Sequence, residues 1–111
     1  TAASLGIKDA YEKSIETYTT ASSLNPTNPG IQLAMANVSM VATKTKEAKD
    51  YANSALSLKP DYIEALVLLA QVSNTEGDKA SALSFAQKAL SFAPTNKDLI
   101  KYVNSLKGTN E

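Results

Sequence analysis

Glu12 and Glu16 are the residues best placed by spacing to do chemistry, because a separation of four puts both on one face of a helix. Paired carboxylates of this kind can serve as a general acid and a general base. Lys13 stands beside them, however, and such mixed charges are typical of a solvated helix surface. The chain contains no His and no Cys, and its glycines are isolated, so no phosphate-binding loop is present. We therefore predict that the chain is not an enzyme and holds no cofactor and no metal.

The composition is that of one folded domain, with 111 residues of which 43% are apolar. Eleven lysines balance eleven acidic residues, and there is no Arg. This neutrality argues against nucleic acid and anionic membranes as partners. The longest apolar run, 65–70, is far shorter than the about 20 residues that cross a bilayer. We expect a soluble domain without direct membrane insertion, either cytoplasmic or on the outer side of a membrane-anchored parent.

An internal repeat organises the whole chain. Pro26, Pro60 and Pro94 are 34 residues apart, and the residues around them align without a gap. Other positions keep the same spacing, including Met35, Leu69 and Val103. The sequence therefore predicts a partial unit over 1–28, units over 29–62 and 63–96, a capping helix over 97–107 and a tail over 108–111. Because Thr1 falls partway through a unit, we expect the chain to be part of a longer protein.

Each unit is predicted to contain two helices, helix A and helix B, because apolar residues recur at three- and four-residue spacing. The first unit is expected to have a shortened helix A before its helix B. With a closing helix, this makes seven predicted helices. The longer six span about 10–24, 28–42, 46–58, 62–75, 79–92 and 96–107.

The prolines are predicted to separate each helix B from the next helix A, because Pro cannot donate to a helical ladder. The residue after each proline, Thr27, Asp61 or Thr95, is expected to cap the new helix with its side-chain oxygen. Asp9 with Glu12 has the spacing of a capping box for the first helix B.

Small residues recur at fixed places in the repeat. We expect them to let neighbouring helices approach closely while larger apolar side chains fill the space between. They are Ala36 and Ala70 in the A helices, and Ala48, Ala55, Ala82 and Ala89 in the B helices.

These features together resemble the tetratricopeptide repeat family over nearly the whole chain. The closest stretches run from Tyr11 to Tyr18, followed by Ala21 and Leu24-Asn25-Pro26, and from Gly77 to Ala82, followed by Phe85, Ala89 and Pro94. The resemblance implies an all-α, right-handed α-solenoid of antiparallel helix pairs, with about two and a half to three repeats and a capping helix. It also implies a protein-interaction module.

In this family the A helices line a concave groove that holds a peptide or a partner's helix. The positions implied by the resemblance are Leu33, Asn37, Met40, Glu64, Val67, Leu68, Gln71, Asn74, Lys101, Tyr102 and Ser105. Asn37 and Gln71 lie one repeat apart, and carboxamides at that spacing can bond the backbone of an extended peptide. The alternative is that both amides are solvated polar residues. The four apolar positions from Leu33 to Leu68 are expected to be partly core.

Some members of the family clamp a peptide's terminal carboxylate with Lys, Asn and Arg. Here Leu33, Ala34 and Leu68 occupy positions where polar or charged clamp residues are expected, and only Asn37 fits. We therefore predict no carboxylate clamp.

The uncovered apolar side chains of Leu5, Ile7 and Ile15 support a rival hypothesis, in which the chain is a spacer or self-association segment of a larger protein. Abundant Ser, Thr and Asn with Lys resembles bacterial membrane-anchored proteins.

Overall fold

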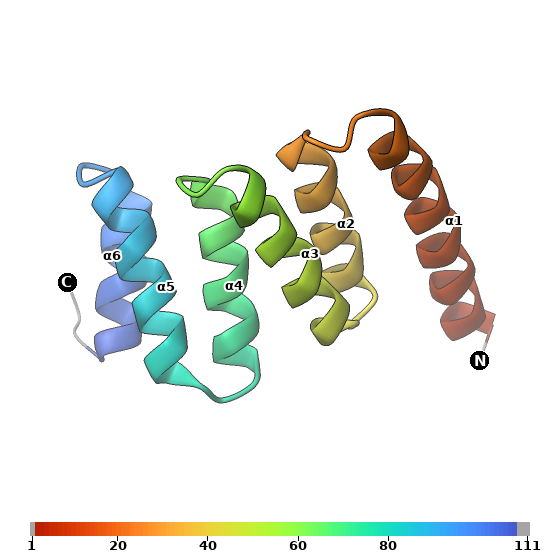
Figure 1. Cartoon of the computed structure of the whole chain (residues 1–111). Helices are drawn as coiled ribbons and strands as arrows, with labels where there is room; N and C mark the ends of the chain where they lie inside the picture. Colours follow the sequence, from red (N-terminus) through yellow and green to blue (C-terminus); the bar gives the residue numbers. More distant parts are fainter. Residues whose placement is uncertain (1, 109–111) are drawn as a thin grey trace.

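The computed structural model describes the backbone of residues 2–108 and the side chains of residues 6–108. Six α-helices make up this part of the chain and stand side by side in chain order (Figure 1). No strand occurs among these residues, and the predicted all-α solenoid is confirmed. The helices are α1 (Ala2–Leu24), α2 (Pro29–Val41), α3 (Thr45–Leu58), α4 (Ile63–Thr75), α5 (Lys79–Phe92) and α6 (Lys97–Lys107).

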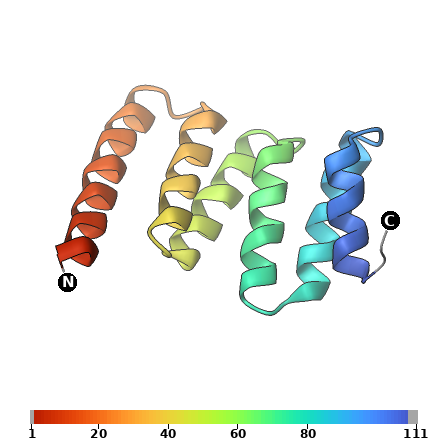
Figure 2. The ribbon, with the colours of Figure 1, turned by 180° about the vertical axis from the view of Figure 1, so that it is seen from behind.

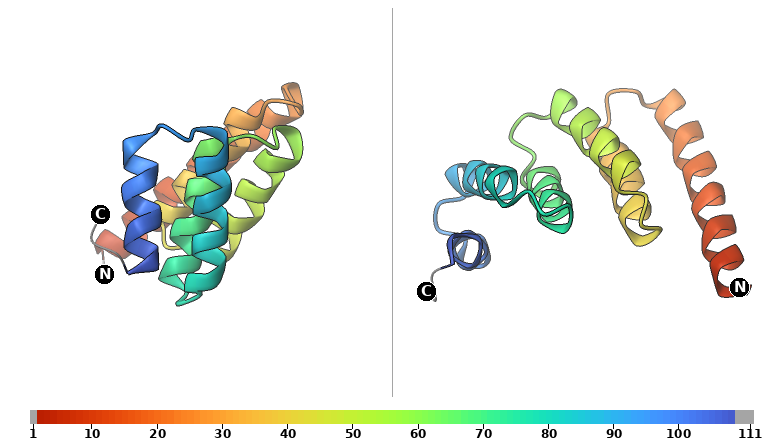
Figure 3. Two further views of the ribbon diagram at one scale, coloured as in Figure 1. Left: turned by 90° about the vertical axis from the view of Figure 1, so that its left-hand side faces the viewer. Right: turned by 90° about the horizontal axis from the view of Figure 1, so that it is seen from below.

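The helices form two layers. Each packs against the next one along the chain, and α2 also contacts α4. Figure 2 shows α2, α4 and α6 on the near face, with α3 and α5 behind them. The view from below in Figure 3 shows that the array bends, with α4 and α6 on its inner side. The predicted A helices therefore share the concave face, and the B helices share the convex one.

The first helix differs from the prediction. The expected shortened helix A and the helix B after it form one continuous helix of 23 residues, α1. Asp9 does not cap a new helix, because α1 continues unbroken through it. Its carboxylate pairs with Lys13 Nζ at 3.3 Å across one helical turn. Gly6 alone does not break the helix, since a single glycine costs only about 1 kcal/mol within one. The side chains of Ala2 and Leu5 lie outside the described residues.

The predicted caps lie one residue too early. The amides of Asn28, Tyr62 and Asn96 each donate to a carbonyl three residues back, which closes a turn around the proline before the helix begins. Thr27, Asp61 and Thr95 therefore lie inside the turns. The N-caps are Asn28, Tyr62 and Asn96. The Asn28 Oδ1 accepts from the Gly30 amide at 2.9 Å, and the Asn96 Oδ1 accepts from two amides. Tyr62 makes no side-chain cap bond.

Asp78 is the N-cap of helix α5. The Asp78 carboxylate accepts from the Ser81 amide at 3.1 Å and from the Ser81 hydroxyl at 2.7 Å. These two hydrogen bonds hold the pKa of Asp78 below its usual value, and the bond from the Ser81 amide has the larger effect. Stability from this cap is therefore present above the unfolded pKa and is lost as the pH falls through the folded one.

The small residues of the repeat lie in the interior of the array. All six predicted alanines are fully buried: Ala36, Ala48, Ala55, Ala70, Ala82 and Ala89. Met35, Leu69 and Val103, the matching large residues of the A helices, are at most 3% exposed. Both columns therefore lie inside the core.

The turns after α2 and α4 have the same backbone design but different residues. In each, an amide bonds the carbonyl five residues back, Lys44 to Ser39 at 2.7 Å and Asp78 to Ser73 at 2.9 Å. This helix ending needs a left-handed residue, which is most often Gly. Gly77 has a φ of 84°, whereas Thr43, one repeat earlier, has a φ of 58°. A β-branched residue is strained in that region, so the first of these turns stores strain.

Replacement of Thr43 by Gly is expected to raise the free energy of unfolding by about 0.5–1 kcal/mol, measured by urea denaturation. Relief of the left-handed strain, about 1–2 kcal/mol, exceeds the added entropy of the unfolded chain. Ser54→Gly, at an exposed position within α3, is the control and should lower stability instead. A loss of stability in Thr43→Gly would contradict the assignment of strain.

Candidate peptide-binding groove

A groove opens on the concave face and is lined by residues of α2, α4 and α6. It has a volume of about 530 Å³. Helix α6 packs against α5, and its backbone lies further from α4 than the backbone of α2 does, which leaves the space open. The groove is lined by Leu33, Asn37, Ile63, Glu64, Val67, Leu68, Gln71, Asn96, Asp98, Leu99 and Tyr102.

Seven of the eleven residues expected at the groove line it, from Leu33 and Asn37 on α2 to Tyr102 on α6. The other four lie outside the lining. Met40 packs against the core cluster that joins α2, α3 and α4. Asn74, Lys101 and Ser105 are exposed elsewhere on their helices. The structure therefore brings together the first and middle turns of the A helices, and leaves out most of the positions toward their ends.

Four lining residues were not expected: Ile63, Asn96, Asp98 and Leu99. All belong to the start of α4 or α6. One signal in the sequence could have found Asp98, because it lies 34 residues after Glu64 and so occupies the same place in the repeat.

The floor of the groove is apolar. Leu68 and Leu99 are 3% and 5% exposed. Leu33 packs against the core cluster that contains Leu68, and Val67 packs against the one that contains Leu99. These four side chains belong to, or pack against, the hydrophobic core beneath the groove. The expectation that the apolar groove residues are partly core is confirmed.

The carboxamides of Asn37 and Gln71 are exposed at the groove. Within the part of the chain that the structure describes, neither carboxamide makes a hydrogen bond. The hydrogen bond that Gln71 accepts from the Thr75 hydroxyl goes to its backbone oxygen, not to its side chain. Each amide therefore keeps a donor and an acceptor for another molecule.

Tyr102 carries a polar atom without a partner. Its hydroxyl is buried and, among the described residues, makes no hydrogen bond. Burial raises the pKa of Tyr102 above its ordinary value, because the phenolate loses its hydration there. The ring thus contributes to the apolar wall of the groove, and the hydroxyl stays neutral over the physiological range.

A second cavity, of about 330 Å³, lies between α1 and α2 and is called the α1–α2 pocket below. Ile7 and Val41 line it and are 53% and 81% exposed, and Asn37 lines both cavities. Ile15, which was expected to be uncovered beside Ile7, is half-buried. The pocket is almost entirely apolar apart from Asn37, Ser14 and the Tyr11 hydroxyl.

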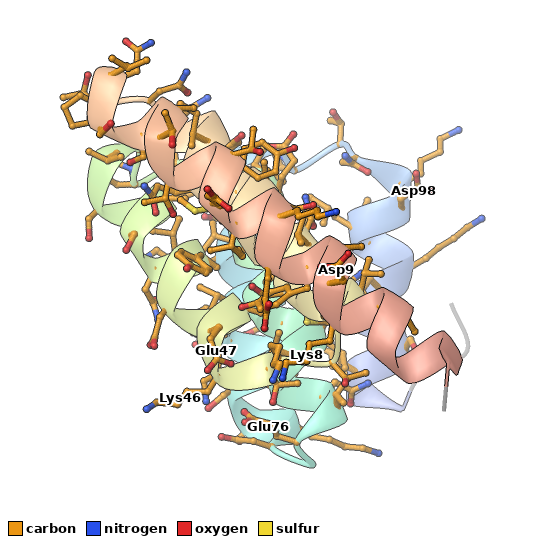
Figure 4. The ribbon with its side chains drawn as sticks, turned by 90° about the vertical axis from the view of Figure 1, so that its right-hand side faces the viewer. Lys8, Asp9, Lys46, Glu47, Glu76 and Asp98 are labelled. Atoms are coloured by element: carbon orange, nitrogen blue, oxygen red, sulfur yellow. The ribbon has the colours of Figure 1, made fainter. Side chains whose placement is uncertain are left out.

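The carboxylates that suggested catalysis are exposed on α1. Glu12 pairs with Lys8 at 4.0 Å, and Glu16 is exposed one turn further along. Within the described range no three His, Cys, Asp or Glu side chains group as metal ligands would. Figure 4 shows Lys8 and Asp9 on α1, on the surface of the array.

Comparison with known proteins decides the family. Residues 63–96 match the family model described as tetratricopeptide repeat. A solved structure, described as the first TPR of Spaghetti (RPAP3) bound to HSP90 peptide SRMEEVD, is similar over 91% of this chain and 80% of that chain. The TM-score is 0.80 at 19% sequence identity. The chain is built of tetratricopeptide repeats.

A human relative is similar over most of this chain. The protein O-mannosyl-transferase TMTC1 is 30% identical over 98 residues, which is 88% of this chain. The chain spans 11% of that protein's length. The match therefore covers a short segment of a much larger protein.

The groove of this tetratricopeptide-repeat domain has acidic and not basic charges. Its charged lining residues are Glu64 and Asp98, and both are exposed. Leu33 and Leu68, at two of the positions considered for a clamp, form part of its apolar floor.

None of the helices in the described part of the chain has the length and apolar character of a membrane span.

Proposed function

We propose that this chain is a protein-interaction domain that binds an extended peptide or a helical segment in the groove. One observation carries the proposal: Asn37 and Gln71, one repeat apart, present unpartnered carboxamides above an apolar floor. The apolar floor supplies burial for side chains, and the carboxamides supply hydrogen bonds to a peptide backbone. The peptide complex named for the structural neighbour supports the same class of partner.

We also propose that the chain contributes binding rather than catalysis to any larger protein that contains it. The absence of His and Cys, and the exposed position of Glu12 and Glu16 beside lysines, support this reading. The transferase activity in the name of the human relative belongs to a protein about nine times as long as the matched segment. Bacterial origin and compartment stay predictions from composition.

The test is a fluorescence-anisotropy measurement with capped decapeptide libraries that combine apolar and polar residues. Asn37→Ala/Gln71→Ala should weaken binding about tenfold or more, because each lost hydrogen bond is worth about 0.5–1.5 kcal/mol. The matched control is Asn53→Ala/Gln87→Ala, which removes two exposed carboxamides one repeat apart on the convex helices α3 and α5. Equal weakening in both variants, or in neither, would show that the groove is the wrong surface.

A second candidate function is self-association through the α1–α2 pocket, in which another copy of the chain covers Ile7 and Val41. The high exposure of these two apolar side chains beside an apolar cavity favours it. Sedimentation velocity at high micromolar concentration separates the two candidates. A chain that stays monomeric there excludes self-association, whereas a dimer that Val41→Lys dissociates supports it.

A further inference from the structure

We infer that the groove selects cationic peptides, with a lysine or arginine side chain of the guest paired with Glu64 and Asp98. This inference rests on the proposed function, since it names the class of guest for the same groove. Two carboxylates line the groove, one from α4 and one from α6, while no lysine is among its lining residues. Lys97 and Lys101, on α6, lie outside the lining.

The two carboxylates are available to a guest. Both are exposed, and within the described range neither has a lysine within the 4.0 Å of an ion pair. Three other acidic residues, Asp9, Glu12 and Glu76, do have such partners. The chain as a whole is neutral, so the negative charge at the groove is local and would act at contact distance.

The repeat places these acids where one guest can meet both. Glu64 and Asp98 are 34 residues apart, and each is the second residue of its A helix. Asn37 and Gln71 have the same spacing and line the same groove. A peptide that crosses from α2 to α6 therefore meets carboxamides first and carboxylates toward α6.

A purely structural role for these acids is the competing explanation, since acids in the first turn of a helix are stabilised by its dipole. The solenoid does not require an acid at that place, because α2 has Gly30 there and no acid in its first turn. Asn96 already caps α6 through two amides, those of Asp98 and Leu99. The cap thus leaves the Asp98 carboxylate free to face the groove.

The experiment uses three capped decapeptide libraries of identical apolar composition that carry two Lys, two Gln or two Glu. The intact chain should bind the Lys library about three- to tenfold more tightly than the Gln library, and the Glu library more weakly still, because partly exposed ion pairs contribute about 0.2–1 kcal/mol each. The preference should shrink between about 50 and about 500 mM salt, as screening increases.

Glu64→Gln/Asp98→Asn should bind the Lys and Gln libraries equally. The matched control, Glu47→Gln/Asp50→Asn, makes the same change in net charge at exposed acids of α3 and should keep the preference. Figure 4 shows Asp98 on the opposite side of the array from Glu47 and Lys46. Thermal melts show that each variant is folded at the temperature of the binding measurement.

The outcomes separate this inference from the proposed function. Equal binding of all three libraries, still weakened by Asn37→Ala/Gln71→Ala, overturns the cationic guest and leaves the peptide groove standing. A Lys preference that survives in Glu64→Gln/Asp98→Asn also overturns it, because another acidic surface is then responsible. Failure of every library to bind overturns both proposals.

Discussion

Leu69→Ala is expected to lower the free energy of unfolding by about 2–5 kcal/mol. Leu69 is 1% exposed and belongs to the core cluster that joins α2, α3 and α4. Its neighbours there include Ala36, Ala48 and Ala52, whose short side chains cannot extend into the vacated volume. The truncation therefore leaves a cavity in addition to the lost burial. Thermal unfolding followed by circular dichroism should show a fall in Tm of roughly 10–20 °C.

Val41→Ala is the control for this measurement, because Val41 is 81% exposed. It removes two carbons of an apolar side chain from a helix of the same layer, and it should change stability by less than about 0.5 kcal/mol. If Leu69→Ala cost no more than Val41→Ala, the packing of α2 against α4 would have to be different from that described.

Ala70→Leu is expected to destabilise the chain by about 1–3 kcal/mol for the opposite reason, since it adds volume where none is free. Ala70 is fully buried in a cluster with Ala86 and Val103, where α4, α5 and α6 meet. A leucine there must push one of these helices outward, and the displaced helix loses contacts along its length. Urea denaturation gives the change in the free energy of unfolding.

Ala80→Leu provides the matched comparison. Ala80 is an exposed residue of α5, and alanine and leucine have similar helix propensities, so the same added volume should be nearly neutral. A neutral Ala70→Leu would mean that the small residues of the repeat do not set the distance between helices.

Much of the fold could be predicted because individual residues recur at the repeat spacing. The prolines and alanines fixed the units, and the five predicted helices after the first unit each begin and end within one residue of α2 to α6. The first helix was mispredicted because Asp9 and Glu12 look like a cap in isolation. In the structure they pair with lysines four residues away, which suits an uninterrupted helix.

The helix caps failed for a different reason. A side-chain oxygen after a proline is a cap only if the helix starts there, and the turn around each proline takes one more residue to close. Asn28 and Asn96 were therefore the capping residues, and Tyr62 takes that place without a side-chain bond. In that turn Lys59 Nζ lies 5.0 Å from the centre of the Tyr62 ring, a cation–π distance.

The groove could be predicted only in part, because it depends on how far apart successive A helices lie. The repeat register located Asn37, Gln71 and Glu64 from the sequence. The inclusion of Leu99 and Asn96 depends on the separation of α4 from α6, which follows from the packing of α6 on α5. No pattern within a single helix carries that information.

The backbone of each helix lies close to its neighbours in the chain, and the one additional close pair of helix backbones among the described residues is α2 with α4. A domain of this kind behaves as a one-dimensional series of coupled units, in which an end unit can open while the middle stays folded. Helix α1 packs against α2 alone, so its detachment would leave α4 and α5 intact. Amide hydrogen exchange in such a domain is graded from the ends toward α4.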